Sequence, residues 1–158
     1  MKEQIKNFQK LTYAQIDATG MRIRHKKQHD LLEVMKSQHE EVIQNYNRAK
    51  EALKKVVDEA KEKLSDPNVQ FIDVRDKGSF ESETIGNAVN LERGLLEFYL
   101  ADGSPLENEM FKKNPDKEYI VFCGLGGQST LATKTMQDMG IKNVKNMTGG
   151  MTAWKDKK

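Results

Sequence analysis

The sequence predicts an α/β domain with an open parallel sheet flanked by helices, preceded by a long helical segment. The first 64 residues contain no proline and one glycine, Gly20, and they are rich in strong helix formers. After the turn residues SDPN (65–68), short apolar runs alternate with helical patterns, as in parallel sheets with crossover helices. We therefore divide the chain into a helical extension, residues 1–64, and an α/β domain, residues 65–158.

The helical extension carries an apolar stripe with steps of three and four residues, which indicates a long amphipathic helix. Gly20 interrupts the run of helix formers upstream of it. Three interpretations of the stripe stay open: a helix lying on the following domain or on a short helical hairpin, a coiled-coil homodimer through residues 31–64, and a partner-binding arm. The stripe consists of Leu32, Met35, Val42, Tyr46, Ala49, Leu53, Val56 and Ala60, with His39 in one slot.

The domain's elements follow one another with clear boundaries. The alternation predicts strands where apolar and β-branched residues cluster, and helices where the apolar period lengthens. Gly140 supplies a C-terminal cap for the longest of these helices. In chain order we expect a strand at 69–74, a helical turn at 77–83, a strand at 87–91, a helix at 93–100, a strand at 118–123, a helix at 128–139, a strand at 143–147 and a short helix at 149–154.

Composition excludes several classes of protein. The net charge is +2, from 26 basic and 24 acidic residues, which argues against a general nucleic-acid binder. No apolar run is long enough for a membrane span, and the first residues lack the apolar core of a secretory signal. One cysteine excludes an internal disulfide, and no cysteine near His25, His29 and His39 completes a metal site. We expect a soluble cytoplasmic protein without metal or cofactor.

The single cysteine, Cys123, lies in the stretch VFCGLGGQS, between a predicted strand and a predicted helix. Glycines let the backbone turn tightly and aim its N–H groups at one point, and the helix N-terminus adds partial positive charge. Such a loop is an anion-binding nest that favours thiolate over thiol. The pattern therefore indicates a nucleophilic cysteine; the alternative is a buried structural one.

From about residue 69 to 155 the sequence resembles a single rhodanese domain. FIDVRDKGSFE resembles the opening strand with its Asp-x-Arg signature, here Asp73 and Arg75, and ETIGNAVNL resembles the segment that usually reads His-Ile-Pro-Gly-Ala-x-Asn. RGLLEFYLADGSP resembles an insertion in one subgroup of single-domain bacterial members. VFCGLGGQS resembles the active-site loop, and VKNMTGGMTAW resembles the closing strand, Gly-Gly turn and tryptophan.

The resemblance implies a rhodanese-like fold and a sulfurtransferase that carries a sulfane sulfur as a cysteine persulfide. Its partners would be a small sulfur donor, such as thiosulfate, and a thiol or protein acceptor. Cys123 would be the nucleophile and persulfide carrier, Ser129 would add a hydroxyl donor, and Asp73 and Arg75 would form a structural ion pair. The backbone N–H groups expected around the persulfide are those of Gly124, Leu125, Gly126, Gly127 and Gln128.

The sequence departs from the family pattern at the loop. The last loop position, usually arginine, is Gln128, which keeps a donor but loses the charge, so we expect weak thiosulfate activity. Arg93 is the candidate to compensate from outside the loop; alternatively it pairs with Glu97 four residues on. The usual histidine is Thr84, and the Pro-Gly pair reads Gly86-Asn87.

Two functional hypotheses from different classes remain. The first is the sulfurtransferase, favoured by the retained cysteine and glycines. The second is a non-catalytic rhodanese-like interaction or regulatory module, favoured by Gln128 and by the long helical extension. The loop is one residue shorter than that of the related phosphatases, which argues against phosphatase or arsenate reductase activity.

Overall fold

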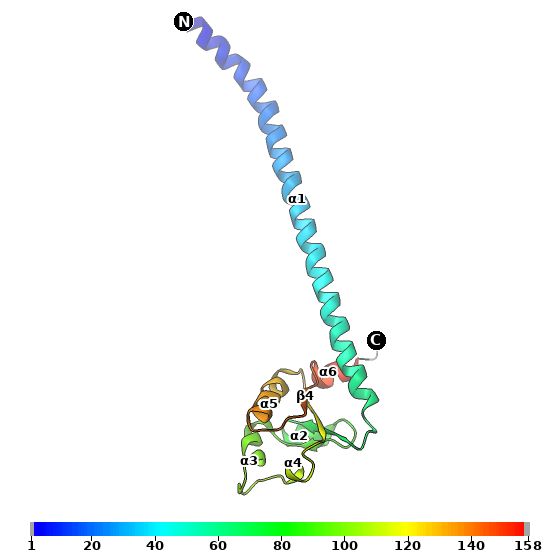
Figure 1. Cartoon of the computed structure of the whole chain (residues 1–158). Coiled ribbons are helices and arrows are strands. Elements are labelled where there is room, and N and C mark those ends of the chain that lie inside the picture. Colours follow the sequence, from blue (N-terminus) through cyan, green and yellow to red (C-terminus); the bar gives the residue numbers. More distant parts are fainter. Residues whose placement is uncertain (1, 157–158) are drawn as a thin grey trace. The chain divides into compact units, whose positions relative to one another are not determined.

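The computed structural model describes the backbone of residues 2–156 and the side chains of residue 22 and residues 24–156. The chain divides into two compact units, Met1–Arg48 and Ala49–Lys158. The N-terminal unit is helical throughout its described residues, and its helix continues without a break into the second unit as α1, Lys2–Glu62 (Figure 1). Gly20 does not interrupt α1, so the helical hairpin among our interpretations is absent.

The C-terminal unit is built on a four-stranded, fully parallel sheet with the strand order β2-β1-β3-β4, which confirms the predicted fold class. Each expected element is present within two residues of its predicted ends, except that residues 93–100 form a 3-10 turn followed by a helix. One short helix, α4, was not predicted. The elements are β1 Val69–Asp73, α2 Lys77–Ser82, β2 Val89–Asn90, η1 Arg93–Leu95, α3 Leu96–Leu100, α4 Met110–Lys113, β3 Glu118–Phe122, α5 Gly127–Asp138, β4 Val144–Asn146 and α6 Gly150–Lys155.

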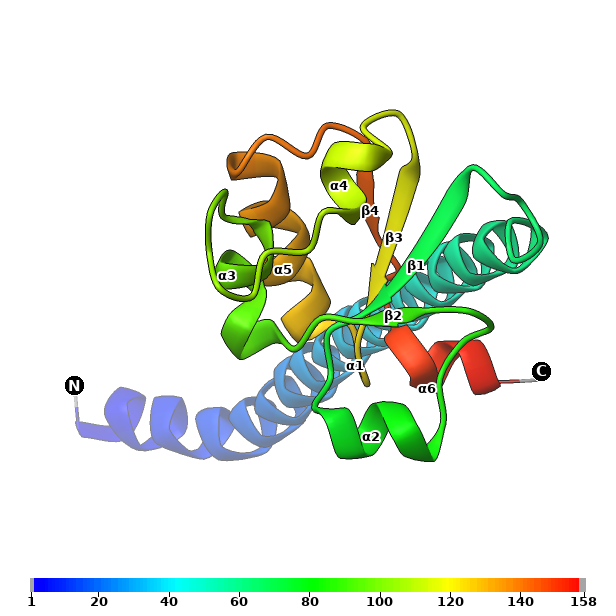
Figure 2. The ribbon, with the colours of Figure 1, turned by 90° about the horizontal axis from the view of Figure 1, so that it is seen from below.

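Helices cover both faces of the sheet (Figure 2). On one face, side chains from α3, α4 and α5 pack on Ile72 and Val121, and the buried Cys123 belongs to this cluster. On the other face, residues of α1 and α6 pack on Phe71, Ile120 and Phe122. Strands buried on both faces explain the continuous apolar runs in the sequence, since neither face is left for polar side chains.

The last turns of α1 are part of the domain's core. Val57 and Ala60 are buried, and Lys63, just after the helix, pairs with Glu118 at the start of β3. Lys61 lies 5.5 Å from the centre of the Trp154 ring, which packs edge-on against Phe71. The compact unit therefore begins at Ala49, whereas we had placed the domain's start at residue 65, because this stretch of helix looks no different in sequence from the turns before it.

Candidate functional site

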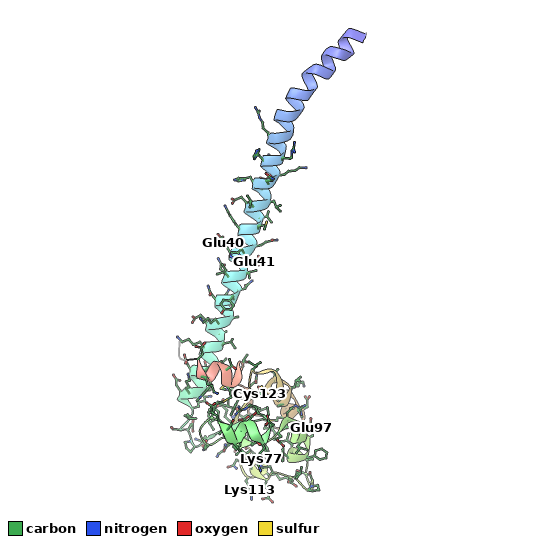
Figure 3. All side chains as sticks on the ribbon, turned by 180° about the vertical axis from the view of Figure 1, so that it is seen from behind. Glu40, Glu41, Lys77, Glu97, Lys113 and Cys123 are labelled. Atoms are coloured by element: carbon green, nitrogen blue, oxygen red, sulfur yellow. The ribbon has the colours of Figure 1, made fainter. Side chains whose placement is uncertain are left out.

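Cys123 lies one residue beyond the end of β3, at the carboxyl edge of the sheet, inside the C-terminal unit (Figure 3). The chain reverses through Gly124 and Leu125 and enters α5 at Gly127. Gly126 has φ +95°, a left-handed conformation, and a Cβ atom there would lie 2.7 Å from the backbone nitrogen of Gly149. Both the backbone angle and the close approach require glycine at this position.

Hydrogen-bond donors converge on the cysteine sulfur. The N–H of Gly126 donates to Sγ at 3.1 Å, and the Ser129 hydroxyl lies 3.5 Å from Sγ. Cys123 and Ser129 are both buried. Burial raises the pKa of Cys123, but hydrogen bonds from the Ser129 hydroxyl and from the N–H groups of Ser129, Gly126 and Leu125 outweigh it, so the net pKa is lowered. The loop thus favours the thiolate although the sulfur is almost out of contact with water.

A second glycine turn holds the loop from behind. Met151 N–H donates to the carbonyl oxygen of Cys123 at 2.9 Å, and Thr152 N–H donates to that of Gly124 at 3.1 Å. A Cβ atom on Gly150 would lie 2.1 Å from the Cys123 carbonyl oxygen. The Gly149-Gly150 pair, recognised in the sequence as a closing motif, is therefore the surface against which the cysteine loop is packed.

Three of the loop residues expected around the persulfide, Gly124, Gly127 and Gln128, are not among the donors to the sulfur. In the described part of the chain, the hydrogen bonds that reach Sγ include none from the N–H groups of Gly124, Gly127 or Gln128. Leu125 exposes 77% of its surface, and Gln128 is exposed. The role of these positions around a persulfide therefore stays a prediction.

Arg93 forms the local ion pair with Glu97, which is one of the two interpretations that the sequence left open. Its guanidinium lies 3.0 Å from Glu97 and donates to the Thr135 hydroxyl of α5 at 3.2 Å. These contacts engage the guanidinium between η1, α3 and α5.

The fully buried Asp73 and the partly buried Arg75 form a multiply bonded pair. The Asp73 side chain is fully buried and accepts from the backbone N–H and the guanidinium of Arg75 and from the Thr84 hydroxyl. The bond to Asp73 also raises the pKa of Arg75. Arg75 donates in addition to the carbonyl of Glu83, so the pair fastens the end of β1 to the segment after α2. Thr84, which stands where the family usually has histidine, is a member of this network.

One polar relay at the site was not predicted. The Asn146 amide donates to the Thr130 hydroxyl at 2.9 Å, and that hydroxyl donates to the Gly126 carbonyl oxygen at 2.7 Å. The relay connects β4 to the residue whose N–H holds the sulfur. The step from Asn146 in β4 to Thr130 in α5 joins residues 16 apart in the sequence, so no local sequence pattern could have shown the relay.

No helix in the described part of the chain is both long and apolar enough to cross a membrane. Among the described side chains, those of residue 22 and residues 24–156, no group of three histidine, cysteine or acidic residues is placed to hold a metal ion.

Comparison with known proteins agrees with this geometry. The rhodanese-like domain model matches residues 56–157. The chain is 34% identical over 94 residues to the Candida glabrata adenylyltransferase and sulfurtransferase UBA4, covering 59% of this chain and 22% of that protein. It is 30% identical over 97 residues to the thiosulfate sulfurtransferase GlpE of Coxiella burnetii, covering 61% of this chain and 81% of that one.

Among solved structures, one from Rhodopseudomonas palustris, described as a "Protein of Unknown Function RPA3614, Possible Tyrosine Phosphatase", shares 32% identity at a TM-score of 0.52. It covers 66% of this chain and 89% of that one. The family match spans well over half of the sequence and includes the cysteine loop, both glycine turns and the last turns of α1. The chain belongs to the rhodanese-like domain family.

Proposed function

We propose that this protein is a sulfurtransferase that carries a sulfane sulfur on Cys123. The observation that supports this most directly is the convergence of the Gly126 and Leu125 N–H groups and both Ser129 donors on one sulfur, with a lowered pKa for Cys123. A thiolate held in this way is a nucleophile at neutral pH.

The reaction is two displacements at sulfur. The Cys123 thiolate attacks the outer sulfur of thiosulfate, the S–S bond of the donor breaks, and sulfite leaves with the bonding electron pair. An acceptor thiolate then attacks the outer sulfur of the persulfide, and the Cys123 thiolate leaves as it began. With a persulfide or polysulfide donor, the leaving group is a thiolate or a shorter polysulfide.

The loop backbone borders open space at two positions. Cβ atoms built on Gly124 and on Gly127 would meet no heavy atom within 4 Å. The N–H groups of Gly124, Leu125, Gly126, Gly127 and Gln128 are the candidates to hold the negative outer sulfur, as preorganised dipoles do in oxyanion holes. This electrostatic role requires no metal or organic cofactor.

Gln128 makes thiosulfate a poor donor. Thiosulfate is a dianion, and the exposed Gln128 side chain offers an uncharged amide where the family usually has arginine. We propose that a persulfide or polysulfide is the better donor and a thiol or protein the acceptor, in the cytoplasm.

Intact-mass measurement tests the proposal. The full chain is incubated with thiosulfate, with polysulfide and with no donor. Because the chain has one cysteine, a gain of one sulfur on the wild type that is absent in Cys123→Ser assigns the persulfide without ambiguity. Cyanide should remove the added sulfur as thiocyanate. A chain that gains no sulfur from any of these donors is not a sulfurtransferase of this type.

The second candidate is a non-catalytic rhodanese-like interaction module. Gln128 favours it, and so do the exposed large apolar side chains on the described part of α1, Leu31, Leu32, Val34, Met35, Val42, Ile43 and Tyr46. A homodimer through residues 31–64 is the form of this proposal that light scattering tests directly. A dimer that becomes monomeric in the Met35→Glu, Val42→Glu double variant supports it, and a monomeric wild type excludes it.

A further inference from the structure

The helix α1 exposes an apolar face within the N-terminal unit. Leu31, Met35 and Val42 follow one another along this face at steps of four and seven residues, and each exposes more than half of its surface. Leu32 lies on one side of this row and Val34 on the other, and both are also more than half exposed. One helix cannot bury such a face by itself, so the face is a candidate contact surface.

The part of the apolar stripe that a second molecule can reach ends before the domain. Val56 and Ala60, later members of the same stripe, pack in the core of the C-terminal unit. That unit begins at Ala49. The homodimer considered above therefore has to use the stretch before residue 49 instead of the whole range 31–64.

Charges of opposite sign lie on one edge of the apolar face, at equal distances from its middle. Lys27, Val34 and Glu41 recur at steps of seven, so they share this edge, with Val34 halfway between the two charges. All three side chains are exposed, and Glu41 is marked on α1 in Figure 3. Among the described side chains, no ion pair engages Lys27 or Glu41. Both charges are therefore available to another molecule.

An antiparallel pair of these helices matches the charge order. When two helices pack antiparallel, each edge lies beside the same edge of the other helix. With the symmetry axis at the level of Val34, Lys27 of each copy lies beside Glu41 of the other, which gives two opposite-charge contacts. In a parallel pair this edge would instead meet the opposite edge, where Leu32 and His39 lie, and neither charge would gain a partner of opposite sign there.

We propose that α1 pairs in antiparallel direction with α1 of a second copy of this chain, centred on residues 33–34. In this register Leu31 of each copy packs on Met35 of the other, and Val34 packs on its own equivalent. Burial of these side chains drives association, whereas exposed ion pairs contribute little affinity and determine the direction. The occupant is a second copy because the charge order of this edge is complementary to itself. The proposal rests on the homodimer form of the second candidate function and involves no sulfur chemistry.

Distances between spin labels test the direction. The full chain with Cys123→Ser receives one new cysteine, either Ser37→Cys or Asn47→Cys, and is labelled with a nitroxide for double electron–electron resonance. Both positions are exposed. An α-helix rises 1.5 Å per residue, so the antiparallel pair separates the two labels along the axis by about 10 Å at residue 37 and about 40 Å at residue 47.

A parallel pair would give the same short distance at both sites, and a monomer would give no coupling between labels. Either result overturns the proposal, and neither bears on the sulfurtransferase, because the loop cysteine is absent from both labelled chains.

Charge reversal tests the register. Lys27→Glu and Glu41→Lys should each weaken the dimer roughly five- to thirty-fold at low salt, because each places two like-charged pairs in the contact. The double variant restores opposite charges, so its dissociation constant in analytical ultracentrifugation should return to within about two-fold of the wild type. Lys26→Glu is the matched control, the same change one residue away on the far side of the helix, and should weaken the dimer less. A double variant as weak as the single ones, or equal effects of Lys26→Glu and Lys27→Glu, would overturn the proposed pairing.

Discussion

Replacing Ser129 by alanine should make Cys123 a weaker nucleophile at neutral pH. The Ser129 hydroxyl is 3.5 Å from the sulfur and 3.1 Å from the carbonyl oxygen of Gly126. A hydroxyl has one proton, so these two acceptors compete for it. The negative charge of the thiolate draws the proton towards sulfur, whereas the neutral thiol sulfur is only a weak acceptor.

The size of the effect follows from this competition. A hydrogen bond to a charged group contributes about 1.5 to 3 kcal/mol in proteins. The contact is long and the proton is shared, so we take about 1 kcal/mol, which corresponds to about a five-fold loss of thiolate at a fixed pH. The N–H bonds from Gly126, Leu125 and Ser129 remain, so the variant should keep a reduced reactivity.

The assay is the rate of iodoacetamide alkylation against pH, followed by intact mass on the single cysteine. In Ser129→Ala the midpoint of the rate profile should move to higher pH, and the rate at neutral pH should fall about five-fold. Thr130→Val is the matched control, because the Thr130 hydroxyl also donates to the Gly126 carbonyl but is not among the donors to the sulfur. Equal profiles for Ser129→Ala and the wild type, or equal shifts in both variants, would show that the serine hydroxyl does not stabilise the thiolate.

Four further outcomes follow from the same structure. Gly150→Ala places a Cβ atom 2.1 Å from the Cys123 carbonyl oxygen at φ +54°, and should lower the free energy of unfolding in urea by about 2 to 5 kcal/mol. Gln128→Arg restores one charge-assisted contact and should raise thiosulfate:cyanide turnover about 10- to 100-fold; unchanged turnover would contradict our account of the loop. Asp73→Asn removes the charge of a fully buried carboxylate that pairs with the partly buried Arg75, and should cost about 3 kcal/mol by the same urea measurement, with a loss under 1 kcal/mol as the contrary result. The pKa of Cys123 is lowered on folding, so its ionised form stabilises the protein fully above the unfolded pKa of about 8.5, and this contribution is lost as pH falls through the folded pKa. The stability difference between the wild type and Cys123→Ser should therefore grow with pH across that window; a flat difference would mean that folding leaves the thiol's ionisation unchanged.

The fold was predictable because its strands are apolar runs bounded by turn residues. EYIVF is buried on both faces of the sheet, so its composition alone identifies a strand. The short helix α4 was missed because it is four residues long and rests on a local side-chain bond, from Met110 N–H to the Asn108 carboxamide, inside a polar segment. A single helical turn is too short to show the spacing of apolar residues by which a helix is recognised in a sequence.

The candidate site was only partly predictable. The cysteine, the glycines and Ser129 are consecutive, so the loop could be read directly from the sequence. For Arg93 the sequence left two interpretations open. An arginine four residues before a glutamate looks the same in the sequence whether it pairs with that glutamate or points into the pocket. The contact of Gly126 with Gly149 and the relay from Asn146 join residues from different elements, and such pairs are fixed by tertiary packing alone.

The close backbone approach of Gly126 to Gly149 also means that the cysteine loop cannot keep its conformation independently of the rest of the domain. The segment from Cys123 to Ser129 is continuous in the sequence, but its conformation depends on contacts with the Gly149-Gly150 turn, which is distant in the sequence. Grafting residues 123–129 alone onto another parallel-sheet scaffold would transfer the thiol without the turn that supports the loop. A graft that keeps the hydrogen-bond donors directed at the sulfur has to include the Gly149-Gly150 turn as well.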